Sequence, residues 1–168
     1  RVEGDWLLQA NKPTQTYDMW PTQSGVLYNQ MINPIIDYRL AGCIWYQGES
    51  NVDKYATYHR VMKALIEEWR KRNGEDFPFY FVQIAPFAYG SPYGLSALLR
   101  EQQEMTWKEV ANTGMVVTND LVDDVHNIHP QDKQNVGLRL ANWALSEKYG
   151  QTGLTYKSPT FKSMRRHG

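Results

Sequence analysis

The chain contains 168 residues, of which 18 are lysine or arginine and 18 are aspartate or glutamate. This length allows one domain with a hydrophobic core, and the formal net charge of zero gives no field that would attract nucleic acid or an anionic membrane. Hydrophobic residues make up 42% of the sequence, and no apolar run approaches the roughly 20 residues that span a bilayer. The composition therefore indicates a folded domain without a membrane span, and it argues against nucleic acid as a partner.

The cysteine content and the first residue add two expectations. Cys43 is the single cysteine, so the chain can form neither an internal disulfide nor a zinc cage built from cysteines. The sequence begins at Arg1 without a methionine and without a charged-then-apolar leader. We therefore expect any targeting segment to have been removed or to lie outside this sequence, as in a fragment of a longer protein.

A polar stretch, one helix and one strand are predicted at the start of the chain. Residues 1–24 are polar and contain proline, which predicts a loop. Residues 26–38 predict a helix that kinks or ends near Asn33, because Pro34 follows. Residues 42–46 are rich in β-branched and aromatic side chains, which is typical of a buried strand.

A strongly periodic helix and a second strand follow. The large apolar residues of 54–73 recur every three or four positions, which predicts a helix that is capped by Asp53 and ended by Gly74. Residues 77–86 are almost continuously apolar, as expected for a strand that is covered on both faces.

The second half of the chain repeats the alternation. Residues 96–110 carry apolar side chains at helical spacing, and residues 115–118 predict a third strand. A polar loop over residues 119–129 leads to a helix that begins with Pro130 and ends at Gly150.

Strands that alternate with helices predict a parallel sheet between two layers of helices. Binding groups in such folds collect in the loops after the carboxyl ends of the strands, here after Tyr46, Ile84 and Thr118. Residues 151–168 are polar and lack periodicity, so we expect a linker or the truncated start of a following segment.

The loop over residues 47–51 is the first candidate site. Gln47 could donate an amide N–H to an oxyanion, and Glu49 could accept from a substrate hydroxyl or orient a histidine. Gly48 between them permits a close backbone approach. The alternative interpretation is that both side chains only satisfy the loop backbone and cap the following helix.

The loop over residues 120–130 is the second candidate site. Asp123 and Asp124 precede His126 and His129, a set of groups that suits a general base with an orienting acid. The same side chains offer nitrogen and oxygen ligands to a metal, although two histidines form a weak ligand set. A third interpretation makes the aspartates solvated turn residues and one histidine a helix cap.

Two short segments together resemble a known family. Trp45 to Asn51 (WYQGESN) and Asn127 to Pro130 (NIHP) resemble the sialate O-acetylesterases and related carbohydrate acetylesterases of the SGNH hydrolase superfamily. The resemblance runs from about Val26 to Gly150, and it includes 26–29 (VLYN), 77–79 (FPF), 82–83 (VQ), 99–101 (LRE) and 112–115 (NTGM).

The resemblance implies a flavodoxin-like, three-layer α/β/α sandwich with a parallel sheet. It also implies hydrolysis of acetyl esters on sugars by a serine nucleophile, with no metal and no cofactor. His129 is then the general base, and Gln47 and Glu49 line the active site, where they serve the oxyanion or the substrate. Residues 1–150 would be the C-terminal part of an SGNH-type esterase domain.

The family's nucleophilic serine lies in a Gly-Gln-Ser-Asn type segment, which this chain lacks. Ser24 lacks the turn between a strand and a helix that exposes a nucleophile, so we do not assign it this role. The sequence therefore predicts a domain that lacks its N-terminal serine strand, and a missing N-terminal segment of the same protein becomes an expected partner.

The acid that orients the base also departs from the superfamily pattern. The position three residues before His129 holds His126 where the superfamily has aspartate. Asp123, Asp124 or Glu49 could take this role, or the machinery could be a dyad without an acid. Our prediction is Asp123, because it stands closest to the third strand.

The predicted function is thus a carbohydrate O-acetylesterase that acts on 9-O-acetyl sialic acid or another acetylated glycan, in the periplasm or the extracellular space. The alternative is a non-catalytic carbohydrate-binding module, since aromatic residues make up 13% of the sequence. The tryptophans lie mostly at apolar helix positions or in a strand, so core packing explains them better than sugar stacking. These tryptophans are Trp45, Trp69, Trp107 and Trp143.

Overall fold

The computed structural model describes residues 23–90 and 94–167, and the chain divides into two compact units, residues 1–38 and 39–168. The predicted loop over residues 1–24 lies almost entirely outside the described residues. In the first unit, a π-helix over Tyr28–Ile32 continues into a 3-10 helix over Asn33–Ile35. The helical stretch ends at Ile35, close to Asn33, where the sequence predicts that the helix kinks or ends.

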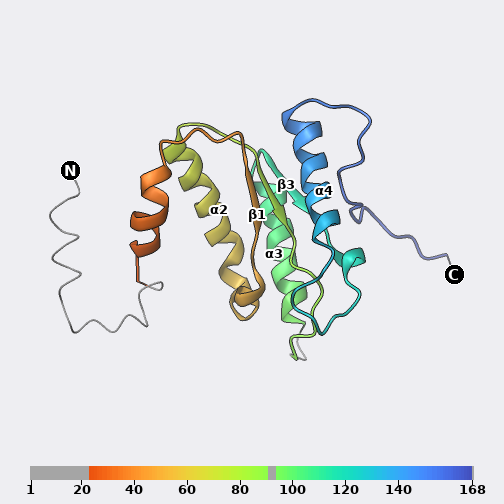
Figure 1. The fold of residues 1–168 in the computed structure, drawn as a ribbon. Coiled ribbons are helices and arrows are strands. Elements are labelled where there is room, and N and C mark those ends of the chain that lie inside the picture. Colours follow the sequence, from red (N-terminus) through yellow and green to blue (C-terminus); the bar gives the residue numbers. More distant parts are fainter. Residues whose placement is uncertain (1–22, 91–93, 168) are drawn as a thin grey trace. The chain divides into compact units, whose positions relative to one another are not determined.

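The second unit contains a parallel three-stranded sheet (Figure 1). Its strands are β1 (Cys43–Tyr46), β2 (Phe79–Val82) and β3 (Thr113–Val116), in the order β1-β2-β3. The helices are α2 (Tyr55–Asn73), α3 (Leu95–Glu109) and α4 (Lys133–Trp143). Each strand has four residues, so the predicted strand over 77–86 is too long, and β3 begins two residues earlier than expected.

The helices lie on both faces of the sheet, with α2 and α3 on one side and α4 on the other (Figure 1). The chain crosses the sheet in one direction from β1 to β3, and right-handed crossovers therefore place α2 and α3 on the same face. One hydrophobic cluster around Phe79, Phe81 and Leu99 fills the α2–α3 side, and a second around Tyr80 and Trp143 fills the α4 side. The predicted three-layer α/β/α arrangement with a parallel sheet is confirmed.

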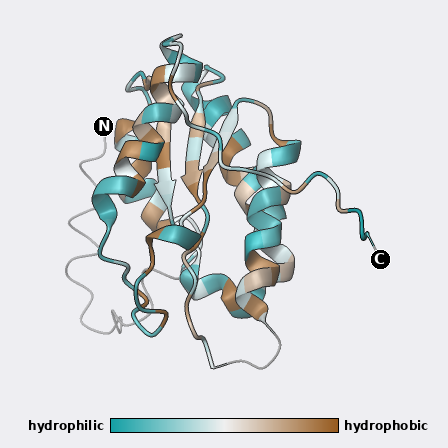
Figure 2. Ribbon diagram, turned by 90° about the vertical axis from the view of Figure 1, so that its right-hand side faces the viewer, coloured by the Kyte–Doolittle hydropathy of each residue, from teal (hydrophilic) through white to brown (hydrophobic). Residues whose placement is uncertain are grey.

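Hydropathy follows this layering. Apolar residues concentrate on the strands and on the inward sides of the helices (Figure 2). Trp143 is 2% exposed, and Trp45, Trp69 and Trp107 are partly buried and pack against the two clusters. Core packing is therefore the correct interpretation of these rings. No helix in the described ranges combines the length and the apolar character that a membrane span needs.

The prediction that residues 42–46 form a buried strand is wrong in part. The strand is present, but its side chains are half-buried and Ile44 is 69% exposed. Within the described residues β1 pairs only with β2, so it is an edge strand. Among the described residues, no strand pairs with the other edge of β1.

The two ends of α2 differ in how well the sequence predicted them. Gly74 ends the helix in a left-handed conformation with φ +74°, as predicted. Asp53 is not the N-cap, because it lies within a 3-10 helix over Glu49–Lys54 that precedes α2. Lys54 takes the cap position, and its side chain makes no capping hydrogen bond.

The start of α4 also differs from the prediction. Pro130 is not the first helical residue, because α4 begins three residues later. The side chain of Asp132 accepts the backbone N–H of Asn135 and so caps the helix. A π-helical turn over Ala144–Lys148 extends α4 nearly to Gly150.

Candidate active site

The loops that follow the three strands gather at one edge of the sheet (Figure 1). The backbone N–H of Ala88 donates to Val125 O at 2.8 Å, which ties the loop after β2 to the loop after β3. The ammonium group of Lys133 lies 4.6 Å from the centre of the Tyr46 ring. Tyr46 directly precedes Gln47, and Lys133 follows the loop that carries His126 and His129. This contact therefore brings together residues that adjoin the two predicted site loops.

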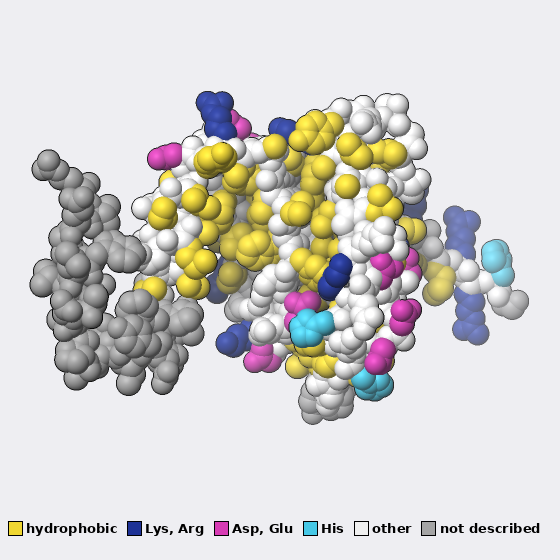
Figure 3. Space-filling view, in the orientation of Figure 1, with side chains coloured by type: hydrophobic (Ala, Val, Ile, Leu, Met, Phe, Trp, Pro, Cys, Tyr) yellow, Lys and Arg dark blue, Asp and Glu magenta, His cyan; other side chains and the backbone are white. Residues whose placement is uncertain are grey.

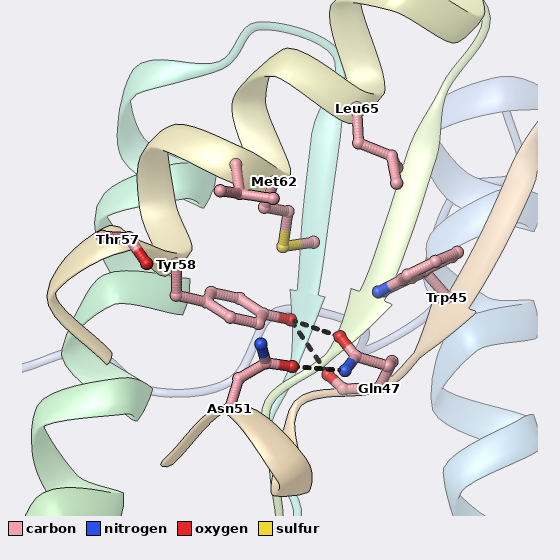
Figure 4. Close-up of a pocket in the computed structure, with 8 residues that line it drawn as sticks. Trp45, Gln47, Asn51, Thr57, Tyr58, Met62 and Leu65 are labelled. Carbon is pink, nitrogen blue, oxygen red and sulfur yellow. Dashed lines mark hydrogen bonds between the residues drawn. The ribbon is translucent and has the colours of Figure 1, made fainter. Parts of the chain in front are cut away.

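Two neighbours, Tyr58 and Asn51, hold Gln47 in place (Figure 4). The Tyr58 hydroxyl donates to the main-chain carbonyl oxygen of Gln47 at 2.9 Å, and it lies 3.4 Å from the side-chain oxygen Oε1. Gln47 Nε2 donates to Asn51 Oδ1 at 2.6 Å. A primary amide has two N–H donors, so one N–H of Gln47 keeps no partner among the described residues. The Gln47 amide is therefore held in place, and its second N–H can donate to a bound substrate.

Gly48 brings the loop backbone against the loop after β2. Its φ is +153°, and a Cβ atom at this position would lie 2.7 Å from Ile84 Cγ2. Side chains of L-residues rarely adopt this backbone conformation. The close approach that the sequence predicted for Gly48 is confirmed.

Gln103 on α3 contacts the residues that follow both β1 and β2. It is fully buried, and its Oε1 accepts the backbone N–H of Ile84 at 2.9 Å. Its Nε2 lies 3.4 Å from Gln47 O and 3.5 Å from Tyr58 Oη. Sequence reasoning missed this residue. The available signal was a polar side chain four positions after Leu99, on the apolar face of the helix.

The Glu49 carboxylate lies among tyrosines. Burial raises the pKa of Tyr46, Tyr58 and Tyr89, and the negative charge of Glu49 raises each of them further. The pKa of Tyr89 reaches about 12. The three phenols therefore stay protonated at neutral pH, and the loop after β1 combines a carboxylate with hydroxyl donors.

The aspartates and histidines of the second loop are exposed. Asp124 Oδ1 accepts the backbone N–H of His126 at 2.8 Å and lies 3.3 Å from its Nδ1. The backbone hydrogen bond lowers the pKa of Asp124. The backbone N–H of His129 donates to Asn127 Oδ1 at 2.9 Å. Asp124 is thus engaged locally with His126, whereas the His129 imidazole faces solvent.

Within the described ranges, no hydrogen bond or ion pair joins Asp123 to His129. Asp123 lines a cavity of about 210 Å³ together with Asp124 and Asn127. The role of Asp123 as the acid that orients His129 stays a prediction. No group of three or more histidine, cysteine, aspartate or glutamate side chains that could hold a metal is assembled among the residues with described positions.

An arginine that sequence reasoning missed holds the start of this loop. Arg139 on α4 donates to Asp120 through two bonds of 2.8 and 2.5 Å, and to Val117 O at 2.6 Å. The hydrogen bond from Arg139 lowers the pKa of Asp120 to about 2. The loop that carries His129 is therefore fixed to both β3 and α4, although its tip remains exposed.

An apolar groove of about 240 Å³ lies between β1 and α2 (Figure 4). Trp45, Met62 and Leu65 line it, together with Val61, which is 58% exposed. Gln47 closes the end of the groove at the carboxyl edge of the sheet. Hydrophobic side chains reach the surface in the middle of this side of the molecule (Figure 3).

Known proteins resemble this chain over most of its length. The sialate O-acetylesterase of Mus musculus is 35% identical over 86% of this chain, and that of Homo sapiens is 34% identical over 83%. A solved carbohydrate acetylesterase from Xanthomonas citri has a TM-score of 0.74 and 41% identity over 82% of this chain. The chain spans 30% of the length of the two sialate O-acetylesterases and 32% of the Xanthomonas citri chain.

The sequence model of one protein family covers a similar range. The family is described as "Carbohydrate esterase, sialic acid-specific acetylesterase", and its model matches residues 7–146. This match agrees with the resemblance that the sequence motifs indicated. The chain therefore belongs to the family of sialic acid-specific acetylesterases among the carbohydrate esterases.

Proposed function

We propose that this chain is part of a carbohydrate O-acetylesterase that removes acetyl groups from sugars such as acetylated sialic acid. The observation that carries the proposal is the Gln47 amide, which is held at the carboxyl edge of the sheet with one N–H that has no partner among the described residues, in a chain of this family. Acetylated glycans are displayed outside cells, so we also propose a periplasmic or extracellular location.

The proposed chemistry is a two-step acyl transfer. A serine hydroxyl attacks the acetyl carbonyl while His129 takes the serine proton, and the free N–H of Gln47 donates to the oxyanion. His129 then gives the proton to the sugar oxygen, which leaves as the alcohol. Water, again activated by His129, hydrolyses the acetyl-serine to acetate. Asp123 would orient His129 in this scheme, and Glu49 would contact the sugar.

We propose that the serine comes from a segment of the same protein outside this chain, which adds a strand beside β1. Three features support this placement: the edge position of β1, the exposure of Ile44, and the groove lined by Trp45 and Val61. In a parallel sheet, helices cover both faces, and each central strand has a neighbouring strand on both sides. Among the described residues, β1 has a neighbouring strand on one side only.

Acetate release by the complete protein tests the function. Incubation with an O-acetylated sialic acid should yield acetate and the free sugar in equal amounts, as followed by proton NMR. The same sugar without the acetyl group is the control and should yield no acetate. A protein that binds the acetylated sugar without releasing acetate would support the carbohydrate-binding module and contradict the esterase.

A further inference from the structure

A hydrogen-bonded chain runs from the buried core to the Gln47 amide. Gln103 is 0% exposed, and leaving the amide of a buried side chain without hydrogen bonds lowers the free energy of unfolding. Tyr58, which is 6% exposed, stands between Gln103 and Gln47. These two side chains come from α3 and α2, so both helices of one layer converge on a residue at the end of β1.

The direction of this chain follows from its donors and acceptors. The backbone N–H of Ile84 can only donate, so Gln103 must turn Oε1 toward it and Nε2 toward Tyr58. The Tyr58 oxygen then accepts from Gln103 Nε2, and its single hydrogen is donated to the Gln47 main-chain oxygen at 2.9 Å, with Gln47 Oε1 3.4 Å from the hydroxyl. The burial that raises the pKa of Tyr58 keeps this hydrogen in place at neutral pH.

We infer that Gln103 and Tyr58 are positioning residues that fix the Gln47 main chain at the end of β1 and, with the Tyr58 hydroxyl beside Oε1, the place of the Gln47 side-chain amide. With Gln47 Oε1 turned toward the Tyr58 hydroxyl and one N–H held by Asn51, the second N–H is left to serve as the oxyanion donor. An amide turned by 180° would place Oε1 opposite the Asn51 oxygen and repel it. This inference rests on the proposed function, because it assigns the fixed N–H to the oxyanion.

A double-mutant cycle in the complete protein tests whether Tyr58 acts through Gln47. Gln47→Ala should lower kcat about a hundredfold, the effect of one oxyanion donor. Tyr58→Phe should lower kcat about tenfold with KM nearly unchanged, because the Gln47 donor is then less well placed for the oxyanion of the transition state. In the Gln47→Ala background the same Tyr58→Phe change should have less than about a twofold effect, because its target is gone. Equal losses in both backgrounds would overturn the inference.

Tyr80→Phe is the matched control, because Tyr80 is buried on the α4 side and its hydroxyl makes no hydrogen bond among the described residues. This change should leave kcat as it is in the parent protein. A loss like that of Tyr58→Phe would show a general effect of removing a buried hydroxyl and would contradict the inference.

A second measurement separates this inference from the proposed function. In the complete protein labelled with ¹⁵N-glutamine, the Gln47 side-chain amide signal, assigned by its loss in Gln47→Ala, should shift in Tyr58→Phe and in Gln103→Met. It should stay in place in Tyr80→Phe. An unshifted signal in Tyr58→Phe overturns the inference whether or not the protein releases acetate. A shifted signal in a protein without esterase activity would leave the positioning intact and reject the function.

Discussion

Replacing His129 with alanine in the complete protein should lower kcat for an acetyl ester by about 10³-fold or more, with a much smaller change in KM. A general base acts on the proton that moves in the transition state, and it contributes little to binding of the sugar in the ground state. Initial rates with a chromogenic acetate ester and with an O-acetylated sugar provide the measurement.

His126→Ala is the matched control for this change. His126 lies in the same exposed loop and contacts Asp124, so its loss should alter kcat by no more than about twofold if only His129 serves as the base. An unchanged kcat in His129→Ala would remove His129 from the mechanism. Equal losses in both variants would favour a joint role of the two histidines, as in the metal-binding alternative.

Gly114→Ala should destabilise the protein by about 1–3 kcal/mol, which is the usual range for overpacking a core. Gly114 lies in β3, and a Cβ atom there would lie 2.6 Å from the ring of Trp143 and 2.8 Å from the ring of Tyr80. Both rings are buried between the sheet and α4, so neither can move without opening the second hydrophobic cluster. Guanidinium denaturation of the complete protein measures the loss.

Gly137→Ala gives the contrast within the same layer. Gly137 lies within α4, and a Cβ atom there would meet nothing within 4 Å. Alanine should therefore stabilise the helix by up to about 1 kcal/mol. A Gly114→Ala protein as stable as the parent would contradict the packing of Trp143 against β3.

The layering could be predicted from the sequence because strand and helix periodicities alternate along the chain. The continuous apolar character of residues 77–86 reflects the full burial of β2, which lies in the centre of the sheet. Residues 42–46 carry the same apolar character, yet Ile44 is exposed. The apolar composition of a strand indicates that the strand is suited to a buried position. The exposed fraction of its side chains depends also on which neighbouring segments are present.

Helix starts were less predictable. Asp53 and Pro130 are both favourable residues for the start of a helix, but short-range hydrogen bonds decide the start. A 3-10 helix takes up Asp53 before α2 begins, and Asp132 binds the N–H of Asn135 to cap α4. Alternative start positions of a helix differ in free energy by about 1 kcal/mol, and residue spacing alone does not distinguish between them.

The candidate site was predictable where it depends on the ends of strands, and it was not where it depends on side chains from distant helices. Gln47 and Gly48 follow β1 directly, so their place at the edge of the sheet follows from the strand assignment. Gln103 and Tyr58 reach that edge from α3 and α2. Their contacts arise from the packing of two helices, which no local sequence pattern encodes.

The position of the nucleophile is the most direct test of the account. The complete protein should be inactivated by a fluorophosphonate, and peptide mass spectrometry should find the adduct on a serine outside these 168 residues. His129→Ala should slow this labelling, because the serine then lacks its base. An adduct on Ser24 or Ser50, or full acetylesterase activity without any adduct, would contradict a site in which this chain supplies the base and the oxyanion donor but not the nucleophile.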